Sequence, residues 1–240
     1  MIFGYDQITW GTFPDVFRFM ADNPGLMLDK IGEHLQISVL AVAMAIALGI
    51  PLGIWLGHLH RGSFVAINVA NVLRALPSLA VVAIGLGFFG IDQTNVIFAL
   101  VVLGFPVILT NAYVAVDSVD ADAVEAARGM GMRPLQILTK VELPLALPLI
   151  FAGIRTAAVF IVATATLAGI VGGGGLGDII VNQSSYFLKG VIAASIAVMA
   201  LAFLTDLALW LVQRAVTPRP LRGKPVADVD LTQVVPIFEQ

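Results

Sequence analysis

The residues from Leu35 to Gly57 include no charged side chain, and this run constrains the fold more than any other feature of the sequence. A helix needs about 18 to 20 apolar residues to cross a hydrocarbon core about 30 Å thick. The block LAVAMAIALGIPLGIWLG within this run approaches that length by itself. Backbone groups in lipid must be hydrogen-bonded internally, so the run predicts a transmembrane helix, with a kink at Pro51.

Composition extends this prediction to most of the chain. Of the 240 residues, 59% are hydrophobic and only 12% are charged, against about a quarter charged in a soluble domain. Apolar segments suited to further spans cover residues 64–91, 93–116, 144–171 and 190–215. We therefore expect an all-α, polytopic membrane protein with about five transmembrane helices. With no cysteine, the chain has no disulfide and no thiolate site.

The second segment carries a polar stripe. Asn68, Asn71, Arg74 and Ser78 recur every three or four residues, which places them on one face of a helix. That face must contact protein or water. Residues 64–91 could form one tilted helix, or a short piece followed by a span after Pro77, and the single helix is the favoured prediction.

The distribution of basic residues predicts the orientation of the chain across the membrane. Lys and Arg concentrate in residues 58–62, in the loop 117–143 and in the tail after Trp210, and such loops are usually cytoplasmic. We therefore expect an external N-terminal segment (1–30), a transmembrane domain (31–216) and an extended or disordered cytoplasmic tail (217–240). Arg74 and Arg155 fall toward the cytoplasmic ends of their helices, where Asp117 or Glu142 could pair with them.

The sequence of the loop 117–143 predicts a short helix, with residues typical of a helix start and of a helix end. Asp120 or Asp122 can serve as the N-cap, and acids are favoured in the first turn by the helix dipole. Gly131 suits the left-handed position that ends a helix, and Pro134 bars its continuation. The alanines between give high helix propensity and little bulk, so such a helix could lie close in a partner's groove. An interfacial helix that merely joins two spans is the plainer alternative.

The spacing in this loop resembles the EAA loop of permease subunits of ATP-binding-cassette (ABC) importers. In that family Glu-Ala-Ala is followed by three residues, Gly, nine residues, Ile, one residue and Leu-Pro. Here Val141 replaces the isoleucine, and the other positions match: Glu125, Ala126, Ala127, Gly131, Leu143 and Pro144.

This resemblance implies a coupling helix seated on a separate ATPase subunit, which would bind ATP and Mg. The chain has no Gly-x4-Gly-Lys-Ser/Thr phosphate loop, so we expect a transport subunit that is not itself an enzyme and holds no cofactor. The implied assembly contains two ATPases, a second permease copy, identical or homologous, and an external substrate-binding protein in a bacterial inner membrane.

Further motifs resemble the osmoprotectant permeases, which take up glycine betaine, choline or carnitine, in the compact five-helix type I fold shared with methionine permeases. They are NVLRALPSL from Asn71, LALPLIFAGIRTAA from Leu145, and GGGGLGD from Gly172 to Asp178. A methionine-type ABC importer is the alternative prediction for the substrate class. A secondary transporter or channel is the alternative from another class, disfavoured by the odd number of helices and the few intramembrane acids.

Individual polar and glycine positions suggest three further features. Polar residues in otherwise apolar helices are candidates for the translocation path or for interhelical hydrogen bonds: Thr110, Asn111, Thr164 and Thr166. The glycine run could be a flexible connection or a tight turn near an outer gate: Gly172, Gly173, Gly174, Gly175 and Gly177. His58 and His60 lack a nearby third ligand, so no metal site is expected.

Overall fold

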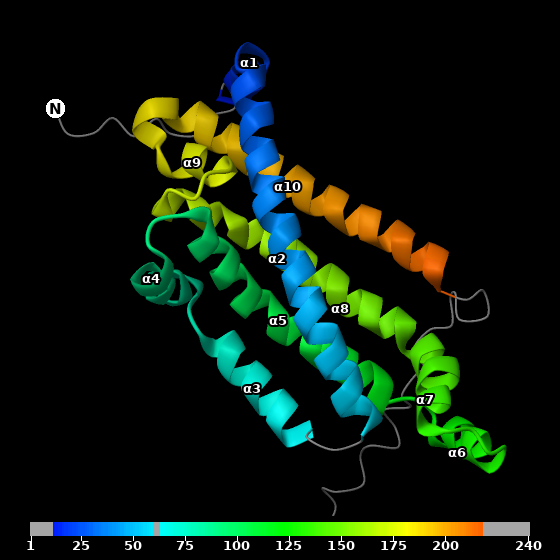
Figure 1. Ribbon diagram of the computed structural model, residues 1–240. Coiled ribbons are helices and arrows are strands. Elements are labelled where there is room, and N and C mark those ends of the chain that lie inside the picture. Colours follow the sequence, from blue (N-terminus) through cyan, green and yellow to red (C-terminus); the bar gives the residue numbers. More distant parts are fainter. Residues whose placement is uncertain (1–11, 60–62, 218–240) are drawn as a thin grey trace, which may run out of the picture.

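The computed structural model describes residues 12–59 and 63–217, and the part of the chain that it describes is helical, with no β-strand (Figure 1). The elements are α1 (Thr12–Asp22), α2 (Pro24–His58), α3 (Ser63–Ala75), α4 (Ser78–Phe89), α5 (Gln93–Asp117), α6 (Ala121–Gly129), α7 (Pro134–Ile137), the π-helix η1 (Leu138–Glu142), α8 (Leu143–Thr164), the 3-10 helix η2 (Ala165–Val171), α9 (Leu176–Val181) and α10 (Gln183–Val216). The predicted all-α class is confirmed.

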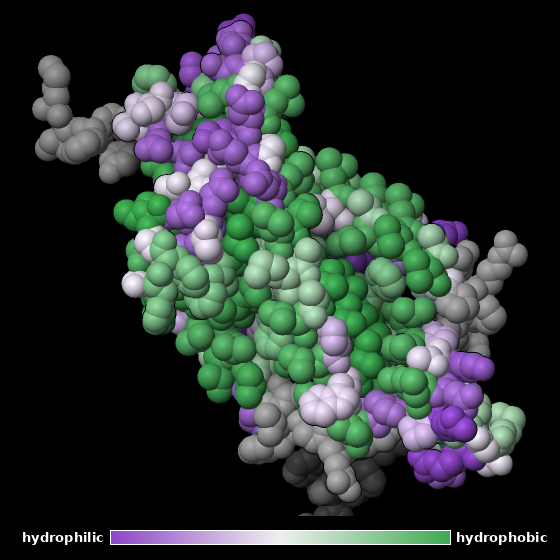
Figure 2. Space-filling view, viewed as in Figure 1, coloured by the Kyte–Doolittle hydropathy of each residue, from purple (hydrophilic) through white to green (hydrophobic). Residues whose placement is uncertain are grey.

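Four helical runs are long and apolar enough to cross a membrane: α2, α5, the run from α7 through η2, and α10, which has a kink at Phe187. The bent pair α3–α4 would make a fifth span. Figure 2 shows a hydrophobic band over the middle of the molecule, with hydrophilic residues gathered at the end that holds α1 and at the opposite end near α6. The expected boundary between residues 30 and 31 falls inside α2, and the tail from residue 218 lies outside the described residues.

The prediction of a single helix over residues 64–91 is wrong. Helix α3 ends at Ala75, α4 begins at Ser78, and the two pieces meet at an angle of 89°. Pro77 has φ −60° and ψ 129° and serves as the N-cap of α4. A proline excludes the α-helical conformation from the residue before it and supplies no N–H for the helical ladder, so the chain turns at Leu76 and Pro77.

Helices α2 and α5 form the central pair, and small residues allow their close approach. Gly49, Gly53 and Gly57 recur every four residues on the buried side of α2. A Cβ atom at Gly53 would lie 2.6 Å from Cβ of Ala112 and 2.7 Å from the Leu109 carbonyl oxygen on α5. Such stripes are typical of membrane helices, because van der Waals packing largely replaces the hydrophobic effect in lipid.

The main hydrophobic core lies where α2, α4, α5 and α8 meet, and includes Ile37, Leu100, Ile108 and Ile161. A second core joins α1, the start of α2, α9 and α10 at the end of the molecule opposite α6.

Asp92 caps α5 by accepting hydrogen bonds from Thr94. The Thr94 hydroxyl, aided by the backbone N–H groups of Gln93 and Thr94, lowers the pKa of the Asp92 carboxyl below its ordinary value.

Candidate coupling site and polar pairs within the membrane

The predicted loop helix is α6, and both of its end signals are present. Asp120 accepts a hydrogen bond at Oδ1 from the Asp122 N–H at 2.9 Å, so Asp120 is the N-cap. At the other end Gly131 has φ 79°. The Gly131 N–H donates to the Arg128 carbonyl at 3.0 Å and the Met132 N–H to the Ala127 carbonyl at 3.2 Å. These two bonds form a Schellman motif, which satisfies the last carbonyls of the helix.

The motif residues divide into an outer and an inner set. Glu125, Ala126 and Gly131 are exposed, together with two large apolar side chains, Met130 (75% exposed) and Leu135 (69% exposed). Ala127 is buried with Val124 and Ile137, and Val141 packs against this small core. Leu143 and Pro144 begin α8 and are half-buried. The inner set therefore holds α6 against α7 and η1, while the outer set is free to contact another protein.

His58 and Glu142 join this loop to the first span. Nδ1 of His58, the last residue of α2, lies 2.6 Å from Oε2 of Glu142 in η1. The Glu142 side chain is only 2% exposed, so His58 gives a buried carboxylate its polar partner. Neither residue was predicted to contact the other, and the motif spacing contains no signal for it. His60 lies outside the described residues.

The partner predicted for Arg155 is wrong. Arg155 on α8 donates from Nε to Oδ1 and from Nη2 to Oδ2 of Asp206 on α10, both at 2.9 Å. Its Nη1 donates to Oε1 of Gln213 at 3.1 Å, and Gln213 in turn donates to the Pro148 carbonyl at 3.0 Å. Such a fork matches carboxylate geometry, and pairing is the usual state of charged residues within a membrane. Glu142 is unavailable to Arg155 because it binds His58.

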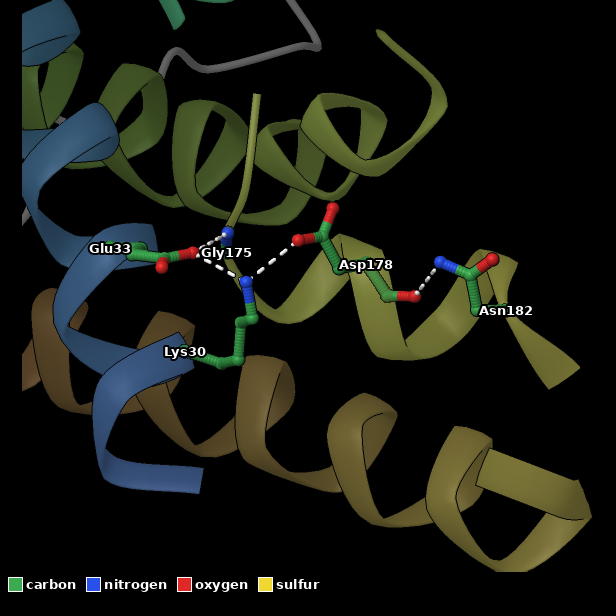
Figure 3. A network of polar contacts seen from close by, with 5 residues as sticks. All are labelled: Lys30, Glu33, Gly175, Asp178 and Asn182. Atoms are coloured by element: carbon green, nitrogen blue, oxygen red, sulfur yellow. Dashed lines mark hydrogen bonds and ion pairs between the residues drawn. The ribbon is translucent and has the colours of Figure 1, made fainter. Parts of the chain in front are cut away.

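The glycine run makes a tight turn held by an ion network at the end of the molecule opposite α6 (Figure 3). Lys30 donates to Oε2 of Glu33 at 2.9 Å and to Oδ2 of Asp178 at 2.7 Å. The Gly175 N–H donates to Oε2 of Glu33 at 2.7 Å. Gly175 has φ 78°, and Gly172 and Gly174 also have positive φ, whereas Gly173 and Gly177 do not. The glycine run is therefore a packed turn rather than a loose connection, and its place at an outer gate stays a prediction.

The four candidate path residues do not gather at one place. Thr110 and Asn111 lie on α5, where each donates to a carbonyl one turn earlier, of Pro106 and Val107 respectively. Thr164 ends α8, and Thr166 in η2 donates to the Ala163 carbonyl. Thr110 alone has an interhelical polar contact, because it also accepts from Nη2 of Arg74 at 3.1 Å. Their role in translocation remains a prediction.

These features define a polytopic helical membrane protein in which one loop between two spans folds as a capped helix with an exposed outer face. The chain belongs to the family of binding-protein-dependent transport system inner membrane components, whose model matches residues 49–218. It is thus a multi-pass inner-membrane component of a transport system. Membership of this family decides against the secondary transporter or channel.

Curated relatives and solved structures agree with this assignment. The chain is 37% identical to the glycine betaine/carnitine/choline permease OpuCB of Bacillus subtilis, over 87% of this chain and 96% of OpuCB. It is 33% identical to the osmoprotectant import permease OsmW of Salmonella typhimurium, over 87% of this chain and all of OsmW. A chain of the inward-facing MetNI methionine ABC transporter superposes with a TM-score of 0.72 at 25% identity, covering 80% of this chain and 97% of that chain. The type I importer fold predicted from the sequence is confirmed.

Proposed function

We propose that this chain is the permease subunit of an ABC importer for small osmoprotectants such as glycine betaine, choline or carnitine, delivered by an external binding protein. The relatives named as osmoprotectant permeases support the substrate class. The methionine transporter shares the fold at lower identity, so its likeness supports the architecture more than its substrate.

The observation that carries the mechanism is the exposed outer set of the coupling loop. Glu125, Ala126 and Gly131, with Met130 and Leu135 beside them, present polar and apolar surface on a helix whose ends are capped within the loop itself. In our proposal this surface seats in a separate ATPase subunit, which binds ATP and Mg and moves the loop on nucleotide binding. The assembly contains two ATPases and two permeases, with the N-terminus outside and the C-terminus in the cytoplasm.

Reconstitution tests the proposal directly. The permease would be placed in proteoliposomes with its cognate ATPase and binding protein, and uptake of glycine betaine, choline, carnitine and methionine would be measured with and without ATP. ATP-dependent uptake of at least one quaternary amine is expected. Uptake of methionine alone would overturn the substrate class.

The coupling surface has its own test. Ala126→Trp adds bulk on the exposed face of α6 and should prevent the ATPase from co-purifying, whereas Gln183→Trp, exposed at the start of α10, should not. If the Ala126 variant retains both assembly and ATP-dependent uptake, α6 is not the docking helix.

A further inference from the structure

A cavity of about 460 Å³ lies at the bend between α3 and α4. Arg74 and Ser78 line it from the two sides of the bend, Val107 from α5, and Thr156 and Phe160 from α8. Its volume falls within the range of about 300 to 1,000 Å³ found for small-molecule sites. Mostly apolar walls with a few convergent polar groups are the usual composition of such sites.

Arg74 brings a guanidinium group to this cavity, and the two acceptors that it contacts are neutral. Its Nη2 donates to the Pro106 carbonyl at 3.2 Å and to Oγ1 of Thr110 at 3.1 Å, and both acceptors are neutral. Within residues 12–59 and 63–217, Arg74 has no carboxylate partner, and its Nε and Nη1 atoms have no acceptor. A guanidinium offers five N–H donors and binds carboxylates through two parallel hydrogen bonds. The N–H groups at Nε and Nη1 of Arg74 therefore remain available to bind an anion.

The cavity does not suit a lipid-facing surface. Arg74 lies about 16 Å along α3 from Ser63 at about 1.5 Å per residue. If the basic residues 58–62 mark the cytoplasmic surface, as the sequence predicts, Arg74 lies inside the membrane rather than at its cytoplasmic edge. A charge at that depth faces protein or water, and broken helices are tolerated only where they line a cavity or are buried in protein. The bend is therefore expected to face the water-accessible path or the second permease.

The part of the wall that α8 contributes suits a cation. Phe160 is 42% exposed in the isolated chain, and aromatic faces attract quaternary ammonium groups. Thr156, one turn before Phe160, donates its hydroxyl to the Ala152 carbonyl at 3.0 Å and keeps lone pairs for water or ligand. The Ser78 hydroxyl has no hydrogen-bond partner among the described residues, so it can donate to an anion beside Arg74.

We propose that this cavity binds a zwitterion during translocation, with Arg74 and Ser78 holding its carboxylate and Phe160 facing its quaternary ammonium group. The inference rests on the proposed function and narrows its substrate class. Glycine betaine and carnitine carry both groups. Choline has no carboxylate, so it would add a second positive charge beside the guanidinium without offsetting it. The site therefore favours zwitterions over choline.

The absence of cysteine allows a direct binding test. Thr156→Cys places a single thiol at the cavity of the permease–ATPase complex, studied without binding protein, and its rate of modification by a maleimide is measured. Glycine betaine and carnitine should slow the modification, and choline at the same concentration should not. Adding Arg74→Gln should abolish this protection. Ser185→Cys, exposed on α10, should be modified at a rate that no ligand changes.

Uptake by the complete reconstituted transporter provides the second arm. Arg74→Gln should lower the rate of glycine betaine uptake about tenfold or more, because it removes hydrogen bonds to a charged group. Arg74→Lys should restore part of the rate. Phe160→Leu should lower the uptake of all quaternary amines, whereas Phe88→Leu, exposed on α4, should not. Assembly and ATPase activity stimulated by the binding protein show whether each variant is folded.

These outcomes distinguish a failure of the proposed binding site from a failure of the proposed transport function. Equal protection by choline, protection that survives Arg74→Gln, or no protection by any ligand would each overturn the site. Normal uptake by a folded Arg74→Gln transporter would do the same. If the unsubstituted transporter takes up no quaternary amine, the proposed function fails, and the labelling assay still judges the site by itself.

Discussion

Nδ1 of His58 lies 2.6 Å from Oε2 of Glu142, and this contact joins the end of the first long helix to the element that carries the coupling loop. Helix α8 continues directly from η1, so Glu142 lies where the loop becomes a transmembrane helix. A displacement of α6 by an ATPase would therefore reach both α2 and α8 through a short, hydrogen-bonded path.

The His58–Glu142 contact predicts a loss of stability in His58→Ala. The substitution leaves a buried carboxylate without its partner, which costs about 1 to 3 kcal/mol and should lower the melting temperature of the detergent-purified complex. Glu142→Gln keeps a hydrogen-bonding side chain of the same shape and should be milder. Measurement of both single variants and the double variant gives the coupling energy, and strictly additive effects would contradict a direct interaction.

Gly131 and Gly129 provide a matched pair in the coupling loop. Gly131 has φ 79°, so Gly131→Ala places a side chain in a left-handed conformation and should cost about 1 to 2 kcal/mol. Gly129→Ala lies at the end of α6 with nothing within 4 Å of the new Cβ, so it should be neutral or stabilising. ATPase co-purification and ATP-dependent uptake should fall only for Gly131→Ala; equal effects would mean that the loop tolerates no added bulk at either position.

Gly53 tests the packing of the central helix pair. Gly53→Ala would bring a methyl group within 2.7 Å of the Leu109 carbonyl, so α2 and α5 must separate, at a cost of about 1 to 3 kcal/mol. Gly32→Ala, on the exposed side of the same helix with nothing within 4 Å, is the control. A lower melting temperature for Gly53→Ala than for Gly32→Ala is expected, and equal values would argue against tight packing here.

The Lys30–Asp178 ion pair predicts a coupling that depends on salt. Both side chains are partly buried, so the pair is screened less than a fully exposed one, and a coupling energy of about 1 kcal/mol is expected. Thermal unfolding of Lys30→Gln, Asp178→Asn and the double variant would measure it. The coupling should weaken as sodium chloride rises, because salt screens charges. Coupling that is independent of salt would point to packing rather than charge.

Helix α6 could be predicted closely because the signals for its two ends are local. Asp120 caps the backbone two residues on, and Gly131 takes a conformation that other residues rarely adopt, so both act over a single turn. The spans could be predicted for a similar reason, since each depends on the length of one apolar run. Residues 64–91 are the exception, because their length and composition fit one helix, whereas Pro77 breaks the helix locally.

Partners across the fold could not be predicted in this way. Arg155 was expected to pair with Asp117 or Glu142, and it binds Asp206, which is 51 residues away in the sequence. Lys30 binds Asp178, which is 148 residues away in the sequence. Several acids were available to each cation, and only the relative positions of the helices decide which one comes within hydrogen-bonding distance.

The sequence by itself determined that this chain crosses a membrane, that one loop between spans folds as a capped helix, and which family it resembles, because apolar length, capping residues and motif spacing act along the chain. The tertiary structure decided that the second span breaks by 89°, and that Arg74 and Ser78 line one cavity with Phe160 of α8. What a charged residue or a bend can bind depends on the residues that face it. In a helical bundle those residues are brought together by packing between helices.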